Sequence, residues 1–379
     1  MLTPTGCRTR QTRLRQSLDE RPCKAAVDAV IIHRPEHLLY LANFFAPPNS
    51  LNYHSSSFLL LEKSGESTLF VDNWLVPVEN AAVDNIVVTD WYDCIAPAEN
   101  RTCVVAESVV KRLQSLRVES IAAELSVLPA HLAIVCAFGT VVDVDERLRE
   151  LRQIKDPDEL QAIQRGIRTA EAIHGASREL LIPGLTELEY YSELVARGIV
   201  AAEAPFVMMC DLASGDRAGA GGGSPTKRHM EAGELVLLDI FPYVEGYRGD
   251  ITNTLVVGGQ PDGEQEETFE LVHEALLAGE ALLRPGVKAS EIYEAVDSTF
   301  RAAGSGCHLT HHAGHAIGLG HPEAPELVPK SDAILAENMV MTLEPGLYGI
   351  SGGGIRLEHD YLITSNGCQR ISHHQLGLI

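Results

Sequence analysis

Two stretches of the sequence decide the fold: 234–257 (ELVLLDIFPYVEGYRGDITNTLVV) and 339–364 (MVMTLEPGLYGISGGGIRLEHDYLIT). Each contains apolar runs of strand character, so each is predicted to form a hairpin, the first turning at Glu245-Gly246 and the second at the glycines of ISGGG. Each also carries carboxylates in or next to its strands, among them Asp239 and Asp250 in the first and Glu344 and Glu358 in the second. A carboxylate in an apolar strand is costly unless it is paired, hydrogen-bonded or bound to a metal. One such residue could be a turn or cap residue, but two on facing strands favour a metal site.

The sequence around these hairpins repeats. LLIPGLTELE (180–189) resembles LLRPGVKASE (282–291), and in both copies a helical pattern precedes and follows the Pro-Gly pair. The spacing between matching positions is nearly constant, at 102 residues for Pro183 and Pro285, 105 for Asp239 and Glu344, and 108 for Asp250 and Glu358. We therefore predict two copies of one helix-helix-hairpin unit, related by a pseudo-twofold axis.

The chain divides into two predicted domains near residue 155. Asp156-Pro157-Asp158-Glu159 is a strong helix start, because Asp156 can cap, proline suits the first helical position and Glu159 completes a capping box. Before this point, short apolar runs of strand character alternate with helical patterns. The prediction is an α/β (α+β) protein with an N-terminal α/β domain at 1–153 and the repeat-containing domain at 154–379.

Composition restricts the classes of function. The chain has 379 residues, 45% of them apolar, and no run of about 18 apolar residues, so no membrane span is expected. The net charge of −22 disfavours nucleic acid as a partner. The N-terminus is basic and polar without a hydrophobic stretch, and the eight cysteines are scattered without a CxxC pair. These features predict a cytoplasmic protein.

Between the hairpins lies CHLTHHAGHAIGLGHPEAP (307–325), with histidines at 308, 311, 312, 315 and 321. The spacing is not HExxH, which disfavours a thermolysin-type helix site. Four carboxylates and one imidazole can hold two divalent ions, for which Mn²⁺ is our first expectation and Co²⁺ or Zn²⁺ the alternatives. Such a pair can share a hydroxide that attacks an amide, and a ligating glutamate can move the proton. Arg356 can orient a ligating carboxylate, or can form a surface ion pair instead.

Residues 155–379 resemble the "pita-bread" metallopeptidases, which include prolidase, aminopeptidase P, methionine aminopeptidase and the metal-free relative creatinase. The likeness is carried by D-x10-D at Asp239 and Asp250, HHAGHAIGL around His315, LEPGLY at Glu344 and GIRLEHDYLIT around Glu358. The N-terminal part resembles the smaller creatinase-type domain. The expected fold is therefore a creatinase-like N-terminal domain followed by a pita-bread domain.

The resemblance implies roles for individual residues. The metal ligands are Asp239, Asp250, His315, Glu344 and Glu358. Catalytic roles fall to Glu344 as general base and to His311 and His321, and substrate binding to His312, Tyr348 and Arg356. The implied function is an Xaa-Pro dipeptidase or aminopeptidase that cleaves the N-terminal Xaa-Pro amide with a metal-bridging hydroxide. The implied substrate is a short peptide or small amide, and analogy with the family implies a homodimer.

Two positions depart from the family pattern. The peptidases carry a histidine seven residues after the ligand histidine, where this chain has Pro322, and another at the position aligned with Gly222. Loss of one such donor typically costs about 10²–10³ in rate. His321 and His229 are the candidates to replace them. The alternatives are a metal-dependent hydrolase of a non-peptide C–N bond, such as an ectoine-hydrolase-like enzyme, and a non-enzymatic binding module on the same fold.

Overall fold

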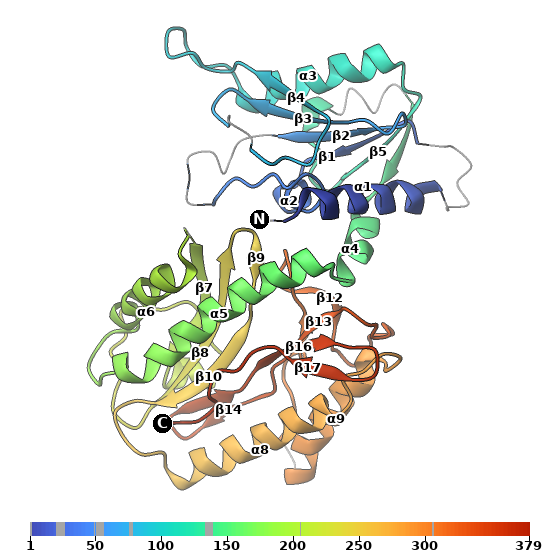
Figure 1. Ribbon diagram of the computed structural model, residues 1–379. Helices are drawn as coiled ribbons and strands as arrows, with labels where there is room; N and C mark the ends of the chain where they lie inside the picture. The colour runs from blue at the N-terminus through green and yellow to red at the C-terminus, as the bar shows by residue number, and fades with distance from the viewer. Residues whose placement is uncertain are drawn as a thin grey trace. The chain divides into compact units, whose positions relative to one another are not determined.

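The computed structural model describes residues 2–19, 27–48, 50, 57–75, 79–132, 139–204, 206–304 and 307–379. The chain forms two compact units, Met1–Arg152 and Gln153–Ile379 (Figure 1). No helix among the described residues is long and apolar enough to cross a membrane. The six described cysteines are free thiols, and Cys23 and Cys136 lie outside the described residues.

The N-terminal unit is built on a six-stranded sheet in the order β4-β3-β2-β1-β5-β6. Strands β1, β2 and β3 pair antiparallel, while β1-β5, β5-β6 and β3-β4 pair parallel. Strands β1, β2, β3 and β5 are buried along their whole length, which explains their continuous apolar sequence. The elements are α1 (Pro4–Asp19), β1 (Ala29–Ile32), α2 (Pro35–Ala42), β2 (Phe58–Glu62), β3 (Ser67–Asp72), β4 (Asn85–Thr89), α3 (Arg101–Leu116), β5 (Ser120–Ala123), η1 (Ala130–Leu132), β6 (Thr140–Asp143) and α4 (Asp145–Gln153).

Buried carboxylates of this unit face cationic or neutral donors. Asp72 accepts two hydrogen bonds from Arg101, at 2.7 Å from Nε and 2.8 Å from Nη2. Glu62 is held by Arg112 in the same two-pronged way, at 2.8 and 3.0 Å. Glu124 contacts His37 and accepts the backbone N–H of Arg34 at 2.9 Å. Each of these negative charges is therefore compensated within the unit.

The first half of the C-terminal unit carries α5 and α6 against a three-stranded sheet, in the order β10-β8-β7, with β9 added to β8. Helix α5 begins after Asp156 as predicted, and the Glu159 carboxylate accepts the backbone N–H of Asp156 at 3.0 Å. A second capping box, Thr186 with Glu189, starts α6. The elements are α5 (Pro157–Leu180), α6 (Glu187–Ala202), β7 (Phe206–Ser214), α7 (Asp216–Gly219), β8 (Leu235–Val244), β9 (Tyr247–Arg248) and β10 (Ile251–Val256).

The second half repeats the order of two helices followed by strands. Its sheet has the order β12-β11-β13-β16-β17, and a separate hairpin is formed by β14 and β15. An apolar core fills the space against α8 and α9, while another fills the first half against α5 and α6. The elements are α8 (Gly263–Glu280), α9 (Ala289–Ala303), β11 (His315–Ala316), β12 (Glu323–Glu326), β13 (Val340–Leu343), β14 (Gly346–Ile350), β15 (Gly353–Arg356), β16 (His359–Ile363) and β17 (Cys368–Arg370).

The two predicted hairpins form with changes in detail. Strand β8 continues to Val244, so Asp239 lies in its middle and not at its end, and Asp250 lies directly before β10. The second region is a hairpin within a hairpin: β13 pairs with β16, and β14 and β15 turn at Ser351-Gly352 between them. Pro345 follows Glu344 and has no N–H to continue the ladder, which is consistent with β13 ending there.

Side-chain and backbone hydrogen bonds join the two halves along β10, β15 and β16. Thr252 Oγ1 donates to Glu358 Oε2 at 2.6 Å, and the Glu358 N–H donates to the Thr252 carbonyl at 3.0 Å. Thr254 Oγ1 exchanges hydrogen bonds with the backbone of Arg356, at 3.1 Å in each direction. The backbone N–H of Asp250 donates to Asp360 at 3.1 Å. This seam brings the two carboxylate pairs together.

Candidate metal and catalytic site

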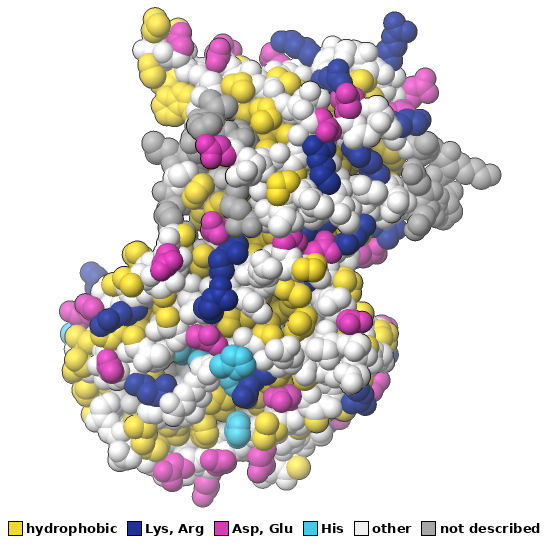
Figure 2. Space-filling model, in the orientation of Figure 1, with side chains coloured by type: hydrophobic (Ala, Val, Ile, Leu, Met, Phe, Trp, Pro, Cys, Tyr) yellow, Lys and Arg dark blue, Asp and Glu magenta, His cyan; other side chains and the backbone are white. Residues whose placement is uncertain are grey.

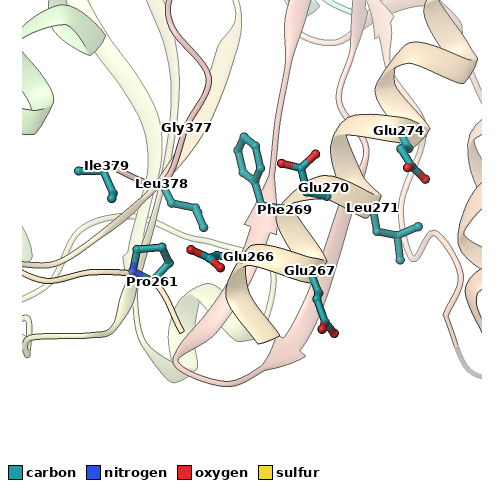
Figure 3. A pocket seen from close by; sticks show the side chains of 10 residues that line it. All are labelled: Pro261, Glu266, Glu267, Phe269, Glu270, Leu271, Glu274, Gly377, Leu378 and Ile379. Atoms are coloured by element: carbon teal, nitrogen blue, oxygen red, sulfur yellow. The ribbon is translucent and has the colours of Figure 1, made fainter. Parts of the chain in front are cut away.

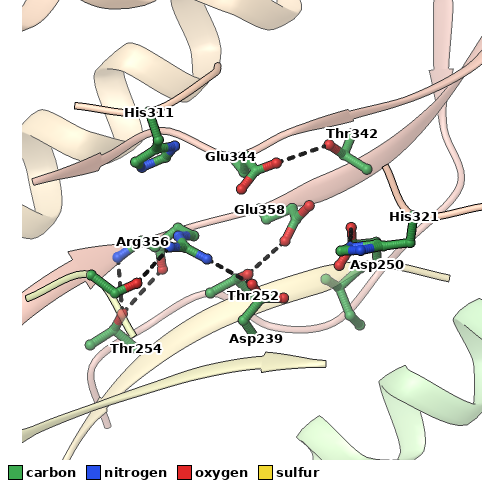
Figure 4. Close-up of polar contacts among 12 residues, drawn as sticks. Asp239, Asp250, Thr252, Thr254, His311, His321, Thr342, Glu344, Arg356 and Glu358 are labelled. Carbon is green, nitrogen blue, oxygen red and sulfur yellow. Dashed lines mark hydrogen bonds and ion pairs between the residues drawn. The ribbon is translucent and has the colours of Figure 1, made fainter. Parts of the chain in front are cut away.

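The four predicted carboxylates meet at the seam between the two halves. Asp239 and Asp250 come from the first half, while Glu344 and Glu358 come from the second, and Figure 4 shows them turned toward a common space. All four are buried, with exposed fractions of 1–6%. Burying so many carboxylates together is unfavourable unless cations compensate them.

His315 lies in the same place, at the start of β11. Its Nε2 is 3.4 Å from Asp250 Oδ2 and 3.4 Å from Glu344 Oε1. Its Nδ1 is 2.9 Å from the carbonyl of Ala316, which accepts only if that nitrogen carries the proton. This tautomer leaves Nε2 as a lone-pair donor facing the carboxylates, as a metal ligand requires. The structure therefore brings all five predicted ligands together.

Arg356 connects one ligand to the pocket residues. Its Nη1 donates to Asp239 Oδ2 at 2.7 Å, its Nε donates to the hydroxyl of Tyr348 at 2.9 Å, and its Nη2 donates to the carbonyl of Gly221 at 2.8 Å. The Tyr348 hydroxyl in turn lies 2.8 Å from His311 Nε2. The guanidinium is buried, so the surface ion pair considered as its alternative role does not apply.

The other two predicted histidines lie on opposite sides of the carboxylates. His312 Nε2 is 3.1 Å from Glu344 Oε1, and His321 Nε2 is 2.7 Å from Asp250 Oδ2. The ring of His321 stacks on Phe241 at 4.1 Å between centroids. Both side chains remain partly exposed, at 33% and 19%, so they can reach both the carboxylates and a molecule in solvent.

The charges of the site are not balanced by its own residues. Burial and the neighbouring carboxylates Asp239 and Glu344 raise the pKa of Asp250 well above its ordinary value. Burial, Asp250 and Glu344 do the same to the pKa of Glu358. Burial also raises the pKa of Asp239 to about 6, even though Arg356 opposes it. These shifts report like charges held close together in a low-dielectric space.

Glu344 differs from the other three carboxylates. Burial alone would raise its pKa, but the hydrogen bond to His312 and the nearby His315 and Arg356 lower it below the ordinary value. Burial lowers the pKa of His315 to about 4, so its imidazole is neutral at pH 7. Glu344 is thus the carboxylate that remains ionised most readily.

The residues fit a pair of divalent cations. Asp239 Oδ1 and Glu358 Oε1 are buried with no hydrogen-bond partner among the described residues. Three groups of donors have ligand atoms within 4.8 Å of one another: Asp250, His315 and His321; His311, His312 and Glu344; and Asp239, Asp250 and Glu358. An oxygen-rich donor set with one or a few imidazoles suits Mn²⁺, Co²⁺ or Zn²⁺.

The partly exposed His312 and His321 give the site access to solvent. Figure 2 shows histidine side chains on the surface of the C-terminal unit, beside basic and acidic ones. A separate surface groove of about 700 Å³ lies along α8 and the chain end, lined by acidic and apolar residues such as Glu266, Phe269 and Leu378 (Figure 3). None of the predicted site residues lines this groove, so it belongs to a different surface.

The positions that depart from the family pattern have distinct surroundings. A side chain at position 222 would place its Cβ 2.9 Å from Asp211 Oδ2, on a backbone with φ +121°, so a histidine there would be strained and would have to displace Asp211. His229 Nδ1 bonds to the carbonyl of Gly184, on the loop before α6, and takes no part in the site. Of the two candidate replacements, only His321 reaches the carboxylates.

Sequence reasoning missed three groups at the site. Thr252 holds Glu358, as described above. Lys155 Nζ is 3.2 Å from Glu323 Oε2, and Glu323 Oε1 accepts the backbone N–H of Gly320 at 2.7 Å, which holds the loop before His321. Asp211 faces Asp239 across β7 and β8. An aspartate inside FVMMCDLAS was the available signal for Asp211; the other contacts depend on the tertiary fold.

A buried set of carboxylates and imidazoles, open to solvent on one side, defines the class of metal-dependent hydrolases. Residues 161–365 match metallopeptidase family M24, and residues 10–154 match the creatinase/prolidase N-terminal domain. The chain belongs to metallopeptidase family M24. The predicted family and fold class are confirmed.

The similar proteins agree with this assignment. An uncharacterized peptidase of Bacillus subtilis is 33% identical over 66% of this chain and 70% of its own length. An Xaa-Pro dipeptidase of Pyrococcus furiosus is 30% identical over 62% of this chain and 68% of its own length. Among solved structures, an Xaa-Pro dipeptidase from Bacillus anthracis has a TM-score of 0.84 at 26% identity, covering 98% of this chain and 99% of that one.

Proposed function

We propose that the chain cleaves the amide bond between an N-terminal residue and a following proline, as a dipeptidase or aminopeptidase that uses two divalent ions held by Asp239, Asp250, His315, Glu344 and Glu358. The observation that supports this most directly is the pair of buried, unpartnered oxygens on Asp239 and Glu358. They belong to a set of carboxylates whose charges lack compensation within the protein. Mn²⁺ is the expected metal, with Co²⁺ and Zn²⁺ as alternatives.

When bound, the two ions supply Lewis-acid polarisation of the substrate carbonyl and lower the pKa of a coordinated water. Glu344 is assigned the role of general base by the family resemblance, and its carboxylate lies beside His312 and His315. A proton taken by Glu344 can pass to the leaving nitrogen of proline. His315 keeps the neutral form, with its Nδ1 proton fixed on Ala316.

The remaining predicted residues surround the substrate. His321, partly exposed and next to Asp250, is placed to donate to the carbonyl oxygen as negative charge develops there. His311, Tyr348 and Arg356 form a continuous hydrogen-bonded row that holds Asp239 in place. Burial and Arg356 lower the pKa of His311 to about 4, so its imidazole stays neutral in this row, with Nδ1 donating to the His312 carbonyl and Nε2 accepting from the Tyr348 hydroxyl.

The experiment is an assay of Leu-Pro and of a longer Leu-Pro peptide with the full chain, reconstituted with Mn²⁺ or Co²⁺. Release of leucine from the dipeptide supports a dipeptidase, and release from the longer peptide supports an aminopeptidase. Leu-Leu serves as the control for proline preference. If the metal-loaded chain turns over none of these peptides, the proposal is wrong.

A second candidate keeps the metals and changes the substrate to a non-peptide C–N bond, as in the opening of a cyclic amidine. The observation that favours it is the position of Gly222, where a histidine would have to displace Asp211. A screen of ectoine-like and amidine substrates, run beside the peptide assay, separates the two candidates. Turnover of an amidine without turnover of Leu-Pro would replace the first proposal with the second.

A further inference from the structure

Asp211 lies on the same face of its sheet as the metal-site carboxylates. In the register of β7, β8 and β10, Asp211 is opposite Asp239, and Asp239 is opposite Thr252. Side chains directly opposite on one face have Cβ atoms about 4.5–5.5 Å apart. The neighbouring residues Cys210, Leu212 and Ile240 pack into the apolar core on the other face. Asp211 therefore points to the reaction side, one strand away from Asp239.

The carboxylate of Asp211 has no partner of its own. It forms no hydrogen bond or ion pair with any residue in the described part of the chain. It is only partly buried, unlike Asp239 beside it. A negative charge in this position repels anions and attracts cations.

The loop formed by the glycines at 221–223 packs closely against Asp211. The Gly221 carbonyl is fixed by Arg356, and a Cβ on Gly222 would meet Asp211 Oδ2 at 2.9 Å. Leu212, next to Asp211 in β7, donates its N–H to the carbonyl of Gly223 at 2.9 Å, which holds the loop against the strand. The loop backbone covers one side of Asp211, and the carboxylate stays only partly buried, so the rest of it is accessible to solvent.

We propose that Asp211 is a specificity-determining residue that binds a cationic nitrogen on the residue of the substrate that carries the scissile carbonyl. The nitrogen is either the α-ammonium group or the side-chain ammonium of a lysine-like residue. The inference rests on the proposed function for the location of the reaction. A charge-assisted hydrogen bond of this kind contributes about a tenfold preference, equal to about 1.4 kcal/mol.

The first test measures binding and needs no turnover. Isothermal titration calorimetry of the Mn²⁺-loaded full chain compares L-lysine, L-norleucine and N-acetyl-L-norleucine in the wild type, in Asp211→Asn and in Asp216→Asn. Asp216 is an exposed aspartate on α7 and makes a matched control for charge. Metal content and the melting temperature of each variant are recorded, so that a loss of metal or of folding is recognised.

The two nitrogen sources give different results. If the side-chain ammonium binds, the wild type prefers lysine over norleucine by about tenfold, and Asp211→Asn removes that preference. If the α-ammonium binds, Asp211→Asn instead reduces the preference for norleucine over its N-acetyl form. Either result supports the proposal when Asp216→Asn behaves as the wild type does. Equal or absent binding of the three compounds by the wild type, or equal ratios in wild type and Asp211→Asn, overturns it.

The second test uses kcat/KM for Lys-Pro and norleucyl-Pro. The Asp211→Asn variant is expected to lower the ratio of lysyl to norleucyl substrate by about tenfold if the side chain is recognised, mainly through KM. Wild-type turnover with unchanged ratios in the variant means that the Asp211 inference fails and the peptidase proposal stands. If the wild type turns over neither substrate but the calorimetric change is as expected, the Asp211 inference stands and the peptidase proposal fails.

Discussion

The N-terminal unit and the carboxylate site of the C-terminal unit treat buried negative charge in opposite ways. In the N-terminal unit, Asp72 and Glu62 each receive two hydrogen bonds from an arginine, and Glu124 contacts a histidine and backbone N–H groups. In the C-terminal unit, four carboxylates share one arginine, Arg356, and imidazoles that are mostly neutral. The difference teaches that a buried carboxylate alone is no sign of function. The sign is a group of them that the protein leaves without enough positive charge.

The largest expected effect comes from Glu358→Gln, which removes one of the four carboxylates that lack sufficient positive charge. We expect metal binding to weaken and kcat/KM for Leu-Pro to fall by about 10³-fold or more, because a ligand oxygen is lost. The metal-free variant should be no less stable than the metal-free wild type, because one of several mutually repelling carboxylates is gone. The measurements are kinetics, metal content and urea unfolding after chelation.

Glu62→Gln is the matched control in the N-terminal unit. It should leave kcat/KM unchanged and lower the free energy of unfolding, since Glu62 has a partner to lose in Arg112. The comparison between the units fails if Glu358→Gln retains full metal content and turnover.

Arg101→Met tests the compensated side. Asp72 is fully buried, and removing its partner leaves a charge without compensation, at an expected cost of about 3–5 kcal/mol. Both tryptophans of the chain, Trp74 and Trp91, lie in this unit, so tryptophan fluorescence during urea unfolding reports on it. Lys63→Met, which breaks the pair of an exposed lysine with Asp28 in the same unit, should cost less than about 1 kcal/mol. Similar losses from both variants would contradict our account of Asp72.

Removal of the metal should lower the melting temperature of the C-terminal unit and leave that of the N-terminal unit unchanged. Metal that is present at about 1,000 times its dissociation constant stabilises the folded state by about 4 kcal/mol, and removal with EDTA forfeits that amount. We expect the melting transition of the C-terminal unit, followed by calorimetry, to move to lower temperature. The tryptophan-monitored transition should stay in place. Equal displacement of both transitions would mean that the units unfold together and that this form of the contrast is wrong.

Acid should remove the contribution that two buried histidines near β10, His174 and His374, make to the stability of the C-terminal unit. Burial lowers the pKa of His374 to about 4, and burial with the charge of His374 lowers the pKa of His174 as well. The unfolded state takes up protons near pH 6.5, before these folded imidazoles do. The stability that these neutral imidazoles contribute is therefore fully present above pH 6.5. It is lost as the pH drops toward 4, by an amount on the order of 2 kcal/mol for His374.

The check for this pH effect is His374→Gln, which retains a donor toward the Thr252 carbonyl that His374 Nε2 contacts. Urea unfolding at pH 7 and at pH 4.5 should show a smaller loss of stability in the variant than in the wild type. An identical loss in both proteins would assign the acid sensitivity to other groups.

Much of this site can be predicted from sequence because a repeat places the carboxylates. The near-constant spacing between Asp239 and Glu344 and between Asp250 and Glu358 is a property of the letters alone. The sequence does not show that the second region divides into the pairs β13-β16 and β14-β15, because this depends on which strands pair at a distance. Asp211 escaped notice for the same reason, since its importance follows from the register of β7 on β8. Lys155 and Glu323 meet although 168 positions separate them.

The seam along β10, β15 and β16 also has a consequence for synthesis of the chain. Its hydrogen bonds join residues 102 to 110 positions apart, as from Thr254 to Arg356 and from Asp250 to Asp360. During translation, Asp239 and Asp250 emerge long before Glu344 and Glu358, and at that time they have no second half to face. The proposed two-ion site is thus completed only near the end of translation, which postpones metal capture until the C-terminal unit can close.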